Sequence, residues 1–128
     1  MEPLPKALAA LAGCTVTRLC VDDSVTLALH ALGRAVTLRV DGPGRLQRAG
    51  AAHGFDTDAD PATAAALLGL LYDTVASGFV GADGTLEIRF ASGAHLSVPA
   101  SEHGVAWSLH TADGARASCI AEGRVVWE

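Results

Sequence analysis

The sequence has few cysteines, few aromatic residues and a single lysine. Its three cysteines, Cys14, Cys20 and Cys119, are odd in number and show no CxxC spacing, which argues against a disulfide framework or a zinc knuckle. Aromatic residues make up 5% of the chain, against 50% for all hydrophobic residues. We therefore expect a core of aliphatic side chains, with alanine as filler and closely packed backbones.

The sequence also lacks a net positive charge and a long apolar run. Its formal charge of −5 at pH 7 disfavours nucleic-acid binding, because that binding depends on Lys and Arg neutralising phosphates. No apolar stretch approaches the roughly 18 residues needed to cross a bilayer, and the first apolar run is short and ends at Gly13. These absences predict a cytoplasmic protein with no nucleic-acid and no membrane partner; a weak signal peptide is the minor alternative.

Two stretches, 21–40 and 81–98, share one plan. In each, an acidic turn precedes an alternating apolar and polar run, and a glycine separates this run from a second one. Such alternation predicts half-buried antiparallel hairpins. At a spacing of 59 residues Leu27 aligns with Leu86 and Leu29 with Ile88, so we interpret the stretches as two copies of one unit. The alternative is that period-two patterning alone produces the match.

Leucines at helical spacing predict helices over 4–12 and 61–73, the second with Asp60 as its N-cap. We predict an α+β fold in which two helix-plus-three-strand repeats and a C-terminal strand extension form a mainly antiparallel curved sheet or a partly open barrel. The chain is then one domain of 128 residues. Its parts are repeat one at 4–46, a connecting loop at 47–60, repeat two at 61–98 and a C-terminal meander at 99–128.

A longer pattern runs through the second half: DGTL at 83–86, Gly93, VPASE at 98–102, Trp107 and GRVVW at 123–127. This order of strands and turns resembles the small bacterial domain-of-unknown-function family 6188, and the first half, around LAGCTVTRLCVDDSVTLAL, is similar too. The chain departs from the family pattern where His103 and Gly104 stand in place of an aromatic residue. The resemblance implies an arrangement of strands, and it carries over no activity, cofactor or functional residue.

The sequence shows no catalytic or metal-binding motif. Asp56, Asp58 and Asp60 offer oxygen ligands of the kind calcium prefers, but the loop lacks the turn glycine and distal glutamate of an EF-hand. The five histidines show no HxH or HExxH spacing, and Ser101 lies outside any GxSxG motif. We therefore expect no catalytic residue, no metal site and no cofactor.

One polar strand face groups residues suited to binding. Glu87, Arg89 and His95 share it, since cross-strand neighbours in the predicted hairpin come within reach of one another. Together with Trp107 they form the predicted ligand or partner face. Two alternatives stay open: Glu87 and His95 act as an acid/base pair or form a mild surface ion pair, and Trp107 stacks on a ligand or fills the core.

These observations predict a non-enzymatic module that binds an unknown protein partner through a strand face or a sheet edge, as an immunity protein neutralises a toxin. The alternative is a small-molecule-binding or weakly catalytic half-barrel, with Glu87, Arg89, His95 and Trp107 around a pocket between the repeats. A homodimer formed through a sheet edge fits both hypotheses.

Overall fold

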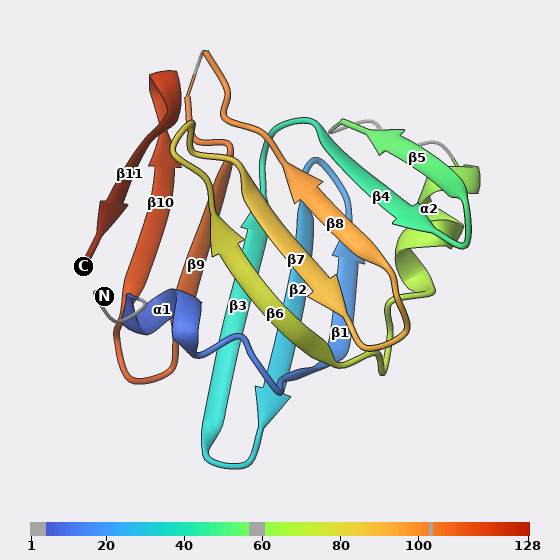
Figure 1. Cartoon of the computed structure of the whole chain (residues 1–128), viewed down its shortest axis with the longest axis horizontal. Coiled ribbons are helices and arrows are strands. Elements are labelled where there is room, and N and C mark those ends of the chain that lie inside the picture. Colours follow the sequence, from blue (N-terminus) through green and yellow to red (C-terminus); the bar gives the residue numbers. More distant parts are fainter. Residues whose placement is uncertain (1–4, 57–60, 103) are drawn as a thin grey trace.

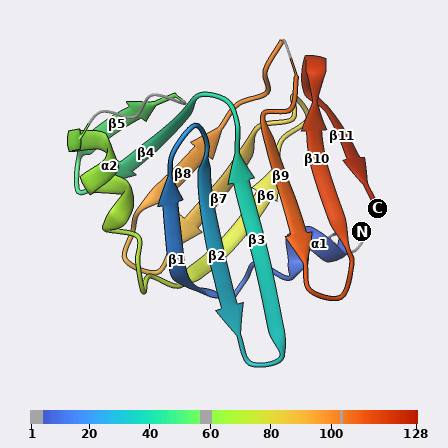
Figure 2. The same cartoon turned by 180° about the vertical axis from the view of Figure 1, so that it is seen from behind.

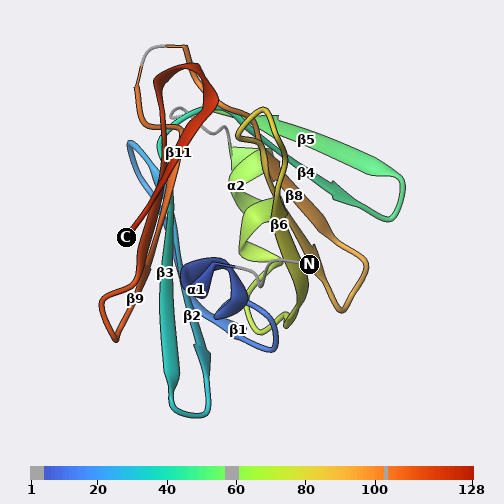
Figure 3. The ribbon, with the colours of Figure 1, turned by 60° about the vertical axis from the view of Figure 1, so that its left-hand side comes forward.

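The structure, a computed structural model, describes residues 5–56, 61–102 and 104–128. They form two antiparallel β-sheets that lie face to face, with a helix at each flank (Figures 1 and 3). The predicted α+β class and antiparallel pairing are confirmed. The strands form two sheets, so the prediction of one curved sheet is wrong. Gly42 and Pro43 interrupt the strand pattern, and the chain there leaves one sheet for the other.

Sheet A has six strands, seen side by side in Figure 2. In spatial order they are β1 (Thr15–Val21), β2 (Val25–Ala31), β3 (Arg34–Val40), β9 (Trp107–Thr111), β10 (Arg116–Ile120) and β11 (Arg124–Trp127). The hairpin predicted in 21–40 is confirmed, since Val25 pairs with Val40 and Ala31 with Arg34. The C-terminal strands extend this sheet because β9 pairs with β3.

Sheet B has five strands. In spatial order they are β5 (Ala51–Phe55), β4 (Gly44–Arg48), β8 (His95–Val98), β7 (Leu86–Phe90) and β6 (Val75–Val80). The loop predicted at 47–60 is wrong over its first part, because β4 and β5 form a hairpin there. Residues 51–54 have little intrinsic strand preference, but pairing of β4 with β8 and the complete burial of Leu46 hold the hairpin on the sheet.

The two helices close the flanks of the sandwich. Helix α1 (Lys6–Ala9) contacts β6, β9 and β10, and α2 (Pro61–Leu68) contacts β1 and β5, so each bridges the two sheets (Figure 3). Both are shorter than the predicted helices over 4–12 and 61–73. A 3₁₀ turn, η1 (Ala121–Gly123), separates β10 from β11. Within the described residues, no helix has the length and apolarity needed to cross a membrane.

The core lies between the sheets and is mostly aliphatic, as the composition predicts. Its largest fully buried side chain is Trp107, and the others are leucines and one isoleucine from both sheets and both helical segments. The three cysteines are free. Burial raises the pKa of the Cys14 and Cys119 thiols, so these residues act as small core side chains, and the thiolate, which is the nucleophile, is disfavoured.

The starts of β1 and β6 join the two sheets. Thr15 and Thr74 form an antiparallel bridge, with 3.2 Å between their Oγ1 atoms. Four backbone hydrogen bonds flank this bridge: Gly13 N to Val75 O, Tyr72 N to Val16 O, Val75 N to Cys14 O and Val16 N to Asp73 O. Among the residues that the structure describes, this corner is therefore the place where strand pairing joins the two sheets.

Candidate functional site

The structure separates the four residues predicted as a ligand or partner face. Glu87, Arg89 and His95 lie on the outer face of sheet B, where Arg89 is opposite His95 in the register. Trp107 is fully buried between the sheets. The prediction is therefore wrong for Trp107, and these four residues form no common pocket, because the core side chains lie between Trp107 and the other three.

The three remaining residues form a weakly charged surface. His95 Nε2 lies 3.5 Å from Glu87 Oε1, and both side chains are just over one-quarter exposed. This distance is long for a hydrogen bond, so the two groups form an ion pair when His95 is protonated. His95 also lines an open depression of about 350 Å³ with Gln47, Arg48, the turn at 49–50 and the start of β5. Glu87 and Arg89 are alternate residues of β7, so this face carries charges of both signs.

The opposite side of the molecule carries a larger and more uniform surface, which sequence reasoning missed. We call it the arginine face and define it as the outward-pointing strand residues of sheet A. They are Thr17, Arg18, Cys20, Thr26, Ala28, His30, Ala35, Thr37, Arg39, Ser108, His110, Arg116, Ser118, Ile120, Arg124 and Val126. Five strand spacings make this face about 24 Å wide.

The arginine face has four arginines and two histidines, and none of its described strand positions holds Asp or Glu. The chain as a whole has 14 acidic against 9 basic residues, so its acidic residues are concentrated elsewhere. Asp41 at the end of β3 neutralises Arg39, at 2.8 Å from its Nε. Arg18 and Arg116 are exposed and belong to none of the ion pairs found in the described parts of the chain.

The middle of the arginine face is shallow and polar. One row across it runs Arg18, Ala28, Thr37, His110 and Arg116 on adjacent strands. Thr37 and His110 line a depression of about 140 Å³ that runs along β3 and β9 to the β9–β10 turn. Small side chains at the centre of the row leave the surface accessible, while the guanidinium groups at its ends supply fork-shaped donors for carboxylates.

The sequence matches a family described as "Family of unknown function (DUF6188)" over residues 7–128. This match covers almost the whole chain. The chain belongs to the DUF6188 family. No curated protein and no solved structure matches it.

Residues that carry the DUF6188 pattern meet at one end of the sandwich. Trp107 Nε1 donates a 2.9 Å hydrogen bond to the carbonyl of Gly84. A Cβ on Gly84 would lie 2.5 Å from the Gly123 carbonyl oxygen, so the β6–β7 turn and η1 are in backbone contact. The DGTL turn, the tryptophan strand and the closing glycine thus form a junction between the sheets, and these members of the pattern have a structural role.

The sequence predicts no metal site, and the structure describes only some of the residues concerned. Among them, no group of three or more His, Cys, Asp or Glu side chains is placed to hold an ion. Of the candidate calcium ligands, Asp58 and Asp60 lie outside the described residues, as does His103. His30 instead shares a hydrogen bond with Thr17, at 2.6 Å between Nδ1 and Oγ1.

Proposed function

We propose that this DUF6188 chain is a non-enzymatic protein-interaction module that binds an acidic protein surface through its arginine face. The observation that carries the proposal is the charge segregation in sheet A: four arginines and two histidines occupy one face, and none of its described strand residues is a carboxylate. Such a face favours a partner of opposite charge and raises its rate of association. Screening by salt should weaken the complex.

The alternative, a small molecule held in a half-barrel, has less support. Leucine, valine and tryptophan side chains fill the space between the sheets, and the four residues assigned to that pocket are divided between the core and the outer face of sheet B. A cytoplasmic location and a homodimer formed through an edge strand such as β5 or β11 stay predictions. Light scattering of the purified protein tests the second of them.

Charge reversal of Arg18 and Arg116 tests the proposed function. We expect Arg18→Glu/Arg116→Glu to retain at least tenfold less of an acidic protein captured from the native cell than the unchanged chain does, because two exposed donors become repulsive carboxylates. The control is Arg45→Glu/Arg89→Glu, which makes the same change in net charge on the outer face of sheet B. If both double variants lose the partner equally, or neither does, the arginine face is not the binding surface.

We also propose that the units 4–46 and 61–98 are two copies of one ancestral segment. The support lies in hydrogen bonds that correspond at a spacing of 59 residues. At the helix ends, Leu11 N to Leu8 O corresponds to Leu70 N to Leu67 O, and Cys14 N to Leu11 O corresponds to Asp73 N to Leu70 O. The four bonds around Thr15 and Thr74 form two equivalent pairs: adding 59 to one residue number and subtracting 59 from the other converts each bond into its partner. A local two-fold axis at this bridge requires such an exchange.

Backbone irregularities correspond as well. Gly13 and Tyr72, 59 residues apart, both have positive φ, at 85° and 68°. The ladders of β1 and β6 shift register at corresponding places, between Val16 and Arg18 and between Val75 and Ser77. Period-two patterning does not generate matched helix ends or matched bulges, so these features favour duplication over chance.

The residue alignment suggested by the sequence needs one correction. Val21 pairs with Val25, whereas its counterpart Val80 pairs with Leu86 across a longer turn. The counterpart of Leu27 is therefore Ile88, two residues beyond the predicted Leu86. A shift of two residues keeps every side chain on the same face of its sheet, which is why the buried pattern alone did not reveal it.

A sequence exchange tests the duplication. A chain in which residues 65–80 carry the sequence of residues 6–21 is expected to fold, with the β1–β6 amides protected from hydrogen exchange. In the matched control, positions 65–80 carry the sequence of residues 7–22. Each side chain is then one position away from its proposed equivalent, which should prevent folding. Rapid exchange at the β1–β6 amides of the first chimaera would contradict the proposed equivalence.

A further inference from the structure

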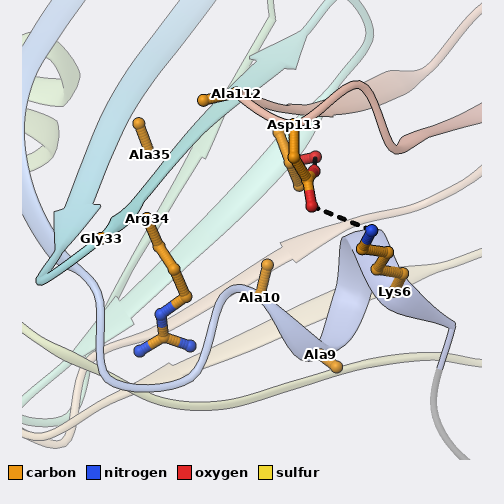
Figure 4. A pocket seen from close by; sticks show the side chains of 9 residues that line it. Lys6, Ala9, Ala10, Gly33, Arg34, Ala35, Ala112 and Asp113 are labelled. Carbon is orange, nitrogen blue, oxygen red and sulfur yellow. Dashed lines mark hydrogen bonds and ion pairs between the residues drawn. The ribbon is translucent and has the colours of Figure 1, made fainter.

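An amphipathic pocket lies at the end of sheet A next to α1 (Figure 4). Its walls come from α1, from the β2–β3 turn and from the β9–β10 turn. Its volume is about 320 Å³, which falls at the lower end of the range for small-molecule sites in proteins. It is separate from Trp107, which lies in the core.

Small residues leave this pocket open. Ala10 lies between Arg34 and Lys6 in Figure 4, and Ala9, Gly33, Ala35 and Ala112 complete the apolar lining. Longer side chains at these positions would occupy the space, so the alanines provide room as well as an apolar surface. A ligand seated here would cover methyl groups of the protein with its own apolar part.

Three charged side chains border the pocket. On one side, Lys6 Nζ lies 3.0 Å from Asp113 Oδ2, and on the other Arg34 extends alone (Figure 4). Arg34 forms none of the ion pairs found within the described residues. Gly13 leaves room for the guanidinium, because a Cβ there would lie 3.3 Å from Arg34 Nη2. Since Lys6 and Asp113 offset each other, one positive charge stays unbalanced.

We propose that this pocket binds a small organic monocarboxylate with an apolar body. Its carboxylate bonds to the Arg34 guanidinium, whose paired donors match the two oxygens, and its apolar part covers the alanines. Only one unbalanced charge is present, which favours a monoanion over a phosphate that carries about two charges. The two proposals depend on different arginines, because Arg34 is not part of the arginine face, although Ala35 belongs to that face and also lines this pocket.

The charges that define the pocket hold over a wide pH range. The hydroxyl of Thr111, the Lys6 ammonium and the Ala115 amide donate to Asp113 and lower the pKa of its carboxyl to about 2. Asp113 is thus ionised at all ordinary pH values and keeps Lys6 neutralised. Ionisation of Asp113 should therefore cause no change in the binding of a carboxylate to Arg34 between about pH 6 and pH 9.

A titration of the full chain followed by amide NMR tests the proposal, with hexanoate as the probe. We expect saturable shifts at Ala10, Ala35 and Ala112 and a Kd on the order of 1 mM, typical of so small a ligand. Hexylamine, which has the same apolar chain and the opposite charge, should cause no saturable shift there. Equal binding of the two compounds, or no saturable shift with hexanoate up to about 20 mM, would overturn the proposal.

Two variants locate the binding. Arg34→Gln should weaken hexanoate binding at least tenfold, whereas Arg45→Gln, which removes one exposed arginine from sheet B, should leave it unchanged. Ala112 lies in an exposed turn, so Ala112→Leu should block the pocket without unfolding the chain. Unchanged hexanoate binding in Arg34→Gln would refute the role of its guanidinium, and unchanged binding in Ala112→Leu would show that the ligand lies elsewhere.

Discussion

Replacing Trp107 with alanine is expected to lower the free energy of unfolding by about 3–5 kcal/mol. Trp107 is fully buried and is the largest side chain of the core, so its truncation leaves a cavity between the sheets. The change also removes the donor that satisfies the Gly84 carbonyl at 2.9 Å. Urea unfolding followed by circular dichroism measures the loss, and an unchanged m-value would show that it is a loss of stability.

Two further variants separate packing from hydrogen bonding at this position. Trp107→Phe keeps most of the apolar volume but leaves the Gly84 carbonyl without its donor, and we expect it to cost about 1–3 kcal/mol. Trp127→Ala is the control, because Trp127 is 39% exposed at the edge of sheet A. If Trp107→Ala costs no more than Trp127→Ala, the assignment of Trp107 to the core is wrong.

Gly84→Ala is expected to cost about 2–5 kcal/mol, from two causes. Gly84 has a φ of +86°, which costs an alanine about 1–2 kcal/mol. The new Cβ would also lie 2.5 Å from the Gly123 carbonyl oxygen and 2.8 Å from its Cα. Because these are backbone atoms, the β6–β7 turn and η1 must move apart, which adds overpacking strain. Thermal unfolding of the variant provides the measurement.

Gly93→Ala isolates the second cause. Gly93 has a similar φ of +95°, but a Cβ there would meet no atom within 4 Å. Its substitution should therefore cost only the conformational part, about 1–2 kcal/mol. The difference between the variants measures the contact of the two turns. Equal losses for Gly84→Ala and Gly93→Ala would mean that the turns are not in backbone contact.

Local alternation predicted most strands because one face of each sheet is buried. Val36 and Leu38 are buried while Thr37 and Arg39 are exposed, and such a period of two is visible in the sequence alone. The pattern failed at residues 51–55, where alanine and glycine give no alternation and pairing with β4 determines the strand. It also could not show that β3 is followed in space by β9, since long-range pairing leaves no local trace.

The same limit explains the errors at the candidate site. Trp107 and Leu109 are alternate residues of one strand, and Leu109 is buried. This alternation favours the core role for Trp107 over the ligand-stacking role, although the sequence alone leaves both alternatives open. The residues of the arginine face come from β1 to β3 and from β9 to β11, so Arg18 and Arg116 share one face only through the order of the strands. The signal in the sequence is that the polar positions of these strands contain arginine, histidine and hydroxyl residues but no Asp or Glu. This signal could have suggested the surface before the order of the strands was known.

Photo-crosslinking in the native cell tests the proposed binding surface most directly. A benzoylphenylalanine at position 37, in the centre of the arginine face, should form an adduct with an acidic protein, and Arg18→Glu/Arg116→Glu should abolish it. The same group at position 47, which is exposed on the outer face of sheet B, should give no such adduct. Adducts at position 47 and none at position 37 would contradict the assignment of the arginine face as the interaction surface.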